Sequence, residues 1–137
     1  MVRYVGGRVG LMTYKILVVD DSRLARMAVA KVLNAVQPEW TRFEASNADE
    51  ALIMAKSKST DIALVDFNMP GRDGLTLAAE LRELNPSMPV AVVSANHQEE
   101  VLRRAREVGA AFLMKPLTQE ALSDFLADAQ KRLARRQ

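Results

Sequence analysis

Cysteine is absent from this sequence of 137 residues, which excludes a disulfide framework, a thiol nucleophile and a cysteine-ligated metal site. There is one histidine, His97, so neither a histidine-rich metal site nor a Ser-His-Asp triad is expected. No apolar run approaches the roughly 20 residues that a membrane-spanning helix needs. The first residues also lack the continuous apolar segment of a signal peptide. We therefore expect a cytoplasmic protein without a membrane partner.

The composition, 49% hydrophobic and 26% charged, is typical of one soluble globular domain. The formal net charge is +2, but residues 1–10 and 131–137 carry basic side chains and no acid, which leaves −4 for residues 11–130. The basic ends fit either contact with nucleic acid or membrane or a solvated helix end, where cations are favoured. We favour the second explanation and do not expect nucleic acid as a partner.

Short apolar runs alternate with amphipathic helical patterns along most of the chain. The predicted strands are residues 16–19, 40–45, 62–66, 90–93 and 110–114. The predicted helices run from the N-cap Ser22 to about residue 35, from the N-cap Asn47 onward, over 74–84, over 97–108, and from 118 towards 133. This pattern indicates an α/β fold with a parallel sheet covered on both faces.

Local details of the helices can also be predicted. Glu50 should complete a capping box with Asn47, and Gly109 should end the fourth helix in the left-handed conformation. In the third helix we expect Leu75, Ala78, Leu81 and Leu84 to face inward.

The chain divides into three parts. Residues 1–13 contain Gly6-Gly7 and show no periodicity, so we expect a loose N-terminal extension. Residues 14–133 form the domain, and residues 134–137 are a basic C-terminal tail.

Polar side chains follow four of the predicted strands. These are Asp20-Asp21, Asp66, Ser94 and Lys115. Each is ordinary alone, since Asp often starts a turn after a strand. Because the carboxyl ends of parallel strands meet at one edge, where open α/β sheets bind ligands, the combination predicts a shared crevice.

Three carboxylates crowded together require a cation. Lys115 supplies one positive charge, and the remaining formal charge of about −2 favours a divalent cation. Oxygen ligands suit Mg²⁺, with Mn²⁺ as an alternative. Asp21 would bind the metal directly, and Asp20 directly or through water.

Such a site is suited to phosphoryl transfer. Asp66, central in the sheet, is the best-placed nucleophile for an aspartyl phosphate. Ser94 and Lys115 would bind the phosphoryl oxygens. The small side chain of Ala95 would leave access to Asp66.

Two further positions have two readings each. The Lys115–Pro116 bond is either cis, aiming Lys115 into the crevice, or an ordinary trans bond at the start of the last helix. Phe112, on the other face of its strand from Leu113, is either a core aromatic or a ring that moves between buried and exposed positions.

Four motifs in order carry a family resemblance: Ile-Leu-Val-Val-Asp-Asp, Asp-Phe-Asn-Met-Pro-Gly-Arg-Asp-Gly, Val-Ser-Ala and Met-Lys-Pro-Leu. The chain resembles a CheY-like receiver domain of two-component response regulators over residues 14–133. The resemblance implies a flavodoxin-like, doubly wound, five-stranded parallel sheet in the order 2-1-3-4-5.

The resemblance also implies roles for single residues. Asp66 would accept a phosphoryl group from a histidine kinase or a histidine phosphotransfer protein. Mg²⁺ would be bound by Asp21, Asp66 and the backbone carbonyl of Asn68, with Asp20 in support.

Within the same family pattern, Ser94 and Phe112 would form the switch, and Phe112 would then be the mobile ring. Asn68 and Asn96 would tune hydrolysis of the acyl phosphate. The last helices and strand would bind a downstream effector protein, as a monomer or a phosphorylation-dependent dimer.

Three functions therefore compete. The first is a single-domain phosphoacceptor switch, which is not a turnover enzyme. The second is a metal-dependent phosphohydrolase, but the acid it needs two residues after the nucleophile is replaced by Asn68. The third is the receiver fragment of a DNA-binding regulator, supported only by the basic residues Arg132, Arg135 and Arg136.

Overall fold

The computed structural model describes residues 2–5, 8–11 and 13–135, with the backbone alone described for 2–5 and 8–11. Strands and helices alternate from residue 15 onward. In chain order they are β3 (Lys15–Val19), α1 (Arg23–Val36), β4 (Thr41–Ala45), α2 (Ala48–Lys58), β5 (Ile62–Asp66), α3 (Gly74–Leu84), β6 (Val90–Ser94), α4 (Glu99–Glu107), β7 (Ala111–Met114) and α5 (Gln119–Arg135). Among the described helices, none is both long and apolar enough to cross a membrane.

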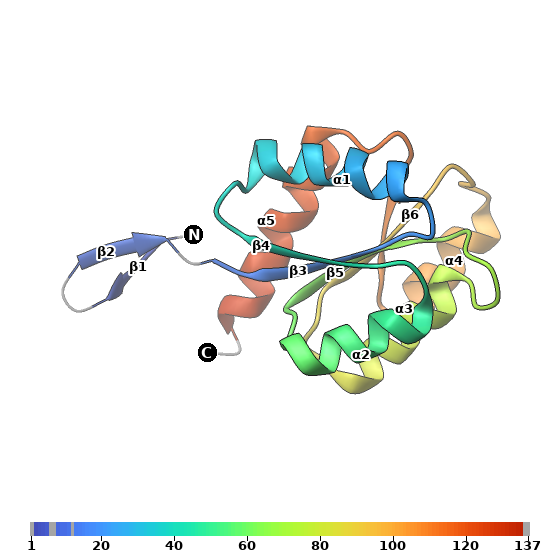
Figure 1. The fold of residues 1–137 in the computed structure, drawn as a ribbon, viewed down its shortest axis with the longest axis horizontal. Coiled ribbons are helices and arrows are strands. Elements are labelled where there is room, and N and C mark those ends of the chain that lie inside the picture. Colours follow the sequence, from blue (N-terminus) through green and yellow to red (C-terminus); the bar gives the residue numbers. More distant parts are fainter. Residues whose placement is uncertain (1, 6–7, 12, 136–137) are drawn as a thin grey trace.

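Strands β3 to β7 form one sheet in the spatial order β4-β3-β5-β6-β7, and all neighbouring strands are parallel. Numbered within this sheet, the order is 2-1-3-4-5, as predicted. Helices α1 and α5 pack on one face, and α2, α3 and α4 pack on the other (Figure 1). The predicted flavodoxin-like, doubly wound α/β fold is therefore confirmed.

The two faces of the sheet are filled by alternate residues along its inner strands. Leu17 and Val19 join the core under α2, α3 and α4, whereas Ile16 and Val18 join the core under α1 and α5. All four side chains are almost fully buried. Burial on both faces explains why this strand reads as a continuous apolar run in the sequence.

The helices begin at the predicted caps. Ser22 Oγ accepts a hydrogen bond from the Ala25 N–H at 3.2 Å, and Asn47 Oδ1 accepts one from the Glu50 N–H at 2.8 Å. The predicted capping box is wrong in one partner. The Glu50 carboxylate accepts hydrogen bonds from the N–H and hydroxyl of Ser46, so it holds the residue before the cap instead of Asn47.

Two predictions on α3 and α4 need correction. Leu84 is 44% exposed, whereas Leu77 is fully buried. Leu84 follows Leu75 by nine residues, which at 3.6 residues per turn corresponds to a rotation of about 180°, so it points away from the core. Helix α4 begins at Glu99 instead of residue 97. Gly109 follows it with φ of 73°, the predicted left-handed conformation.

The expected loose extension over residues 1–13 contains regular structure. Strands β1 (Val2–Val5) and β2 (Arg8–Leu11) pair antiparallel, with Val5 opposite Arg8. The sequence signal was Gly6-Gly7, since two glycines between short strands are typical of a hairpin turn; these two glycines lie outside the described residues. The tail at 136–137 also lies outside them, and helix α5 continues to Arg135.

Candidate functional site

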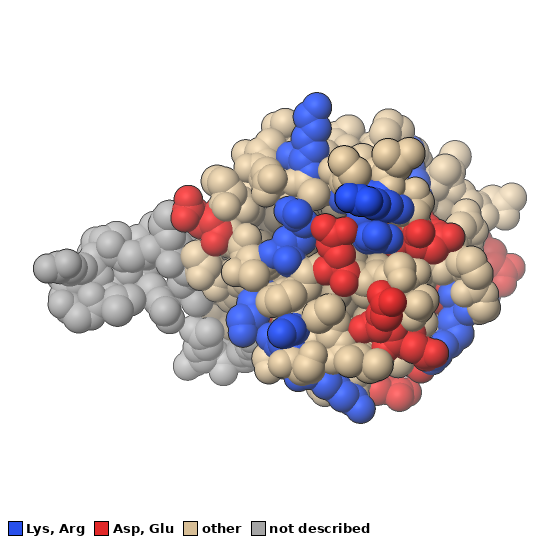
Figure 2. All heavy atoms as spheres, in the orientation of Figure 1, with Lys and Arg blue, Asp and Glu red and all other residues tan. Residues whose placement is uncertain are grey.

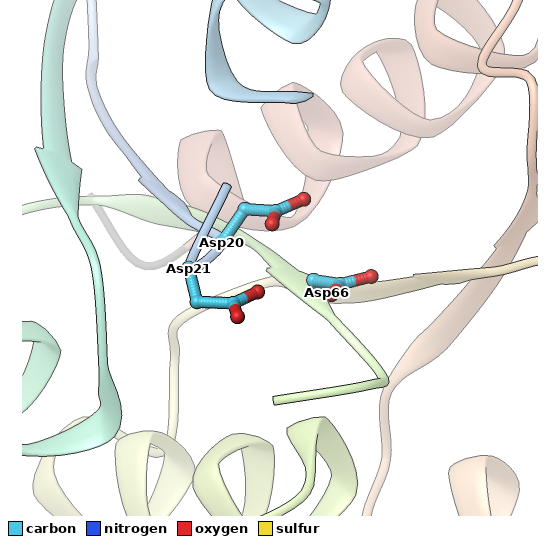
Figure 3. Close-up of side chains that lie close together, drawn as sticks. All are labelled: Asp20, Asp21 and Asp66. Carbon is cyan, nitrogen blue, oxygen red and sulfur yellow. The ribbon is translucent and has the colours of Figure 1, made fainter. Parts of the chain in front are cut away.

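Three carboxylates gather at the carboxyl edge of the sheet. Asp20 and Asp21 follow β3, and Asp66 ends β5, the neighbouring strand. One oxygen from each lies within 4.8 Å of the others. Figure 3 shows the three carboxyl groups directed to the same side of the strand ends. Asp20 and Asp66 are buried and Asp21 is exposed, so the cluster reaches from the protein interior to the surface.

The turn after β3 is held by hydrogen bonds on each side of Asp20. The Asp20 N–H donates to the Ala45 carbonyl at 3.1 Å, which ties the turn to the end of β4. Asp20 Oδ1 accepts the Ser22 N–H at 2.9 Å, and the Asp20 carbonyl accepts a hydrogen bond from Arg26 at 2.6 Å. The turn that presents the two acids is therefore held by two strands and a helix.

Lys115 reaches the cluster from the end of β7. Its Nζ lies 2.7 Å from Asp66 Oδ1 and 3.9 Å from Asp20 Oδ2. Its backbone N–H donates to the Ser94 carbonyl at 3.0 Å, which continues the pairing of β6 and β7 by one residue. The Lys115–Pro116 bond is cis, as one of the two readings of the sequence predicted.

The charges at this edge are not balanced. Burial raises the pKa of Asp20 above its usual range, and the neighbouring charges of Asp66 and Asp21 raise it further. The Ser22 N–H and Lys115 act in the opposite direction without reversing the shift. One ammonium among three carboxylates thus leaves an excess of negative charge, which a bound cation would relieve.

The donor set fits a hard divalent cation. All the side-chain donors in the cluster are carboxylate oxygens, and Mg²⁺ typically binds one or two carboxylates and completes its shell with water and phosphate oxygens. Asn68, expected to contribute its carbonyl, has an exposed side chain two residues after Asp66. The residues present therefore suit Mg²⁺ or Mn²⁺.

The loop after β5 packs tightly against Asp66. The Gly74 N–H donates to the Phe67 carbonyl at 2.9 Å. A Cβ at Gly74 would overlap the carbonyl oxygen of Asp66. Glycine is therefore required at this position by close backbone approach, which the Asp-Gly pair in the sequence did not reveal.

Charged side chains anchor the same loop to its neighbours. Arg72 pairs with Asp49 of α2 and, at 2.6 Å, with Glu80 of α3. Asp73 caps α3 and pairs with Arg104 of α4 at 3.2 Å. These pairs join residues far apart in the sequence, so no local pattern predicts them.

Ser94 and Phe112 lie on the same face of the sheet. Phe112 packs against the core under α2, α3 and α4, and it pairs in register with Val92, two residues before Ser94. Side chains two apart on a strand share a face. Phe112 is partly buried and Leu113 belongs to the other core, as predicted. Ser94 is 1% exposed, and its Oγ accepts the Asn96 N–H at 2.9 Å.

A mostly apolar cavity of about 500 Å³ opens beside the cluster. Asp20, Ala95 and Lys115 line it together with apolar side chains of α1 and the segment after β7. Ala95 is exposed and forms part of this wall. A larger side chain at this position would reduce the space beside Lys115.

The side chains of this site are suited to the transfer of a negatively charged group to a carboxylate. An ionised carboxylate is a nucleophile that needs no further deprotonation. Lys115 and a cation held by the acids would stabilise the negative charge of a group transferred to Asp66. The structure brings Asp20, Asp21, Asp66 and Lys115 within a few ångströms of one another, as the distances above state, and Ser94 ends β6, the strand between those that end at Asp66 and Lys115.

Known proteins are similar to this chain in sequence and fold. Residues 16–127 match the family described as "Response regulator receiver domain". The chain is 34% identical over 117 residues to the positive alginate biosynthesis regulatory protein of Pseudomonas aeruginosa, covering 85% of this chain and 47% of that protein. It is 29% identical over 118 residues to the chemotaxis protein CheY of Halobacterium salinarum, covering 85% of this chain and 97% of that protein.

A solved structure has a similar fold. The response regulator receiver domain protein of Clostridium thermocellum superposes with a TM-score of 0.82 at 25% identity, covering 90% of this chain and 99% of that one. The chain spans about half the length of several curated relatives that it matches. The matched residues, the sheet order and the acidic strand ends lead to one conclusion: this chain belongs to the response regulator receiver domain family.

Proposed function

We propose that this chain is a phosphoacceptor switch of a two-component system or phosphorelay. Asp66 would receive a phosphoryl group from a histidine kinase or a histidine phosphotransfer protein. The observation that carries the proposal is the 2.7 Å ion pair between Lys115 Nζ and Asp66 Oδ1 at the edge of a cluster of three carboxylates. A cation thus lies beside the carboxylate that would attack.

The transfer needs little from the protein beyond position and charge. An Asp66 oxygen attacks phosphorus and forms the new O–P bond with its own electron pair. The bond from phosphorus to the donor nitrogen breaks, and its electron pair stays on the donor imidazole. Lys115 stabilises the charge on the phosphoryl oxygens, and a carboxylate nucleophile needs no base to activate it.

Asp21, Asp66 and the Asn68 carbonyl would hold Mg²⁺, with Asp20 in support; Mn²⁺ could replace it. Bound Mg²⁺ would neutralise charge on the transferred group. Asp20 accepts hydrogen bonds at its carboxylate and its carbonyl, which suits a supporting role. Asp21 is exposed and projects from the same turn.

Ser94 would bind a phosphoryl oxygen and also form part of the switch. In this structure its Oγ accepts the Asn96 N–H, and phosphorylation would redirect the hydroxyl to a phosphoryl oxygen. Phe112, on the same face of the sheet, would then move into the space that Ser94 leaves. The change would reach the surface formed by α4, β7 and α5, where an effector protein would bind.

The remaining predicted roles complete the proposal. Ala95 would keep the approach to Asp66 open, and Asn68 and Asn96 would control access of the hydrolysing water. The protein would act in the cytoplasm as a monomer or a phosphorylation-dependent dimer. It would promote its own phosphorylation and dephosphorylation without acting as a turnover enzyme.

The test is phosphorylation by acetyl phosphate, followed by intact-protein mass spectrometry. We expect the unmodified chain to gain one phosphoryl group in Mg²⁺ and little when the metal is chelated. Asp66→Asn should gain none. Asp128→Asn, which removes an exposed acid of α5 instead, should behave as the unmodified chain. Equal modification of the Asp66→Asn variant would show that the nucleophile lies elsewhere.

A further inference from the structure

Arg26 connects three elements at the edge of the candidate metal site. It lies in the first turn of α1, and its side chain is only 16% exposed. One guanidinium nitrogen donates to the Asp20 carbonyl at 2.6 Å, and Nε donates to Glu44 Oε1 of β4 at 2.9 Å. One partly buried side chain therefore joins α1, the end of β3 and the end of β4.

The carbonyl that Arg26 holds belongs to the peptide between Asp20 and Asp21. The N–H on the other side of Asp20 donates to Ala45, the residue after Glu44. Asp20 is thus bound to β4 twice, once directly and once through Arg26 and Glu44. The Asp20 N–H and the Asp20 carbonyl are both held, so the backbone on each side of Asp20 is restricted, and Arg26 provides the contact to the Asp20–Asp21 peptide.

The two acids depend on this peptide to different degrees. The Asp20 carboxylate has its own hydrogen bond, from the Ser22 N–H. Among the residues that the structure describes, no hydrogen bond or ion pair holds the Asp21 carboxylate. Its direction therefore depends on the backbone, and it is repelled by Asp20 and Asp66, whose carboxylate oxygens lie within 4.8 Å.

The effect of Arg26 on the acids is geometric. Its positive charge faces Glu44, which a second arginine, Arg42, also contacts at 3.3 Å. Burial raises the pKa of Glu44, but Arg26 and Arg42 outweigh it and hold that pKa below its usual range. Figure 2 shows basic and acidic side chains intermixed on the face along which β4 runs in Figure 1.

We propose that Arg26 is a positioning residue for the cation: by holding the Asp20–Asp21 peptide, it directs the Asp21 carboxylate into the metal site. This rests on the proposed function, because it assumes that Asp21 binds Mg²⁺. Residues that orient metal ligands typically contribute about 10- to 100-fold to metal affinity. Loss of Arg26 should therefore weaken Mg²⁺ binding by about tenfold.

The experiment measures Mg²⁺ binding to the full chain by isothermal titration calorimetry, without phosphodonor. Arg26→Gln should raise the dissociation constant about tenfold. Arg42→Gln is the matched control, because it removes the other arginine from Glu44 without touching Asp20, and it should leave the constant nearly unchanged. Equal constants for the two variants would overturn the proposal.

A second readout separates positioning from general loss of structure. In Arg26→Gln, the Mg²⁺ concentration that gives half of the maximal rate of phosphorylation by acetyl phosphate should be about tenfold higher. At saturating Mg²⁺, the rate should return to that of the unmodified chain. A rate that stays low at saturation, with unchanged Mg²⁺ affinity, would contradict a positioning role. If Arg26→Gln does not fold, Arg26→Lys decides: lysine offers one nitrogen in place of the two separate nitrogens with which Arg26 contacts Asp20 and Glu44, so Mg²⁺ affinity should fall. Affinity equal to that of the unmodified chain would overturn the proposal. Failure of the unmodified chain to bind Mg²⁺ would instead overturn the proposed metal site.

Discussion

Asp20 and Asp73 occupy similar local positions, but their pKa values are shifted in opposite directions. Each lies at the start of a helix and accepts a backbone N–H at 2.9 Å, from Ser22 and Thr76 respectively. Burial raises the pKa of both carboxyls. At Asp73, hydrogen bonds from Thr76 and Arg104 outweigh burial, and the pKa falls below its usual range. At Asp20, burial prevails and the pKa rises.

The difference lies in the charges that each carboxylate meets. Asp73 has a guanidinium at 3.2 Å. Asp20 has an ammonium at 3.9 Å that lies closer to Asp66, and it has two other carboxylates nearby. The turn at Asp73 is therefore arranged for stability, whereas the turn at Asp20 holds uncompensated charge, as sites that bind ligands often do. Three variants test this contrast.

The largest effect is expected from Gly74→Ala, in the loop that Asp73 anchors. The new methyl group would overlap the Asp66 carbonyl oxygen, and because this contact is with backbone, relief requires the loop to move. We expect a loss of about 3 kcal/mol in the free energy of unfolding, measured in urea.

The matched control for this variant is Gly71→Ala. Gly71 has φ of 85°, and a Cβ added there would meet no atom within 4 Å, so alanine there should cost only about 1 kcal/mol of backbone strain. If the two variants were equally stable, tight packing of the loop against Asp66 would be wrong.

A smaller loss is expected from Asp73→Ala, which removes the cap of α3 and the partner of Arg104. Loss of an N-cap costs about 1 kcal/mol. Because the folded-state pKa of Asp73 is lowered, its stabilisation is complete above the unfolded-state pKa of about 4 and disappears as pH falls through the folded-state value.

Urea unfolding of Asp73→Ala and the unmodified chain should therefore differ near neutral pH and converge in acid. Thr76→Ala, which removes one hydroxyl contact to Asp73 and keeps the cap, should have the smaller effect. A difference that grows on acidification would contradict the assigned direction of the pKa.

The smallest effect, and the opposite sign, is expected from Asp20→Asn without metal. A raised folded-state pKa means that the contribution of Asp20 is complete below the unfolded-state pKa of about 4 and is lost as pH rises through the folded-state value. The ionised group thus destabilises the metal-free fold near neutral pH. The amide should raise the melting temperature slightly there, since its oxygen can still accept the Ser22 N–H.

This gain should disappear in acid. It should also shrink or reverse in Mg²⁺, because a ligand that binds the folded state stabilises the unmodified chain. Thermal unfolding with and without metal checks both points. An Asp20→Asn variant that is less stable than the unmodified chain at neutral pH without metal would indicate that the crowded charges at this edge are already balanced.

Most of the fold was predictable because its signals are local. Strand β5 and helix α3 occupy the predicted ranges, since an apolar run bounded by turn residues and an apolar stripe at helical spacing are written in consecutive residues. Among the predictions that failed are the inward position of Leu84 and the lack of structure in residues 1–13. The spacing of three that included Leu84 drifts around the helix, and the Gly6-Gly7 turn signal was not used.

The candidate site was predictable in its acids and its lysine. Asp20, Asp21, Asp66 and Lys115 all follow predicted strands, and parallel strands bring their carboxyl ends to one edge. That these four side chains lie close together then followed from the fold class alone. The roles of Ser94, Phe112, Asn68 and Asn96 came from the family resemblance and remain predictions.

The sequence alone determined which residues form the elements and which chemical groups reach the edge of the sheet, because strand ends and side-chain types are local properties. Only the tertiary structure decided how those groups are held. The contacts of Arg26 with Asp20 and Glu44, of Arg104 with Asp73, and of Gly74 with Asp66 join different elements. Their distances depend on the packing of the whole domain, which no run of consecutive residues encodes.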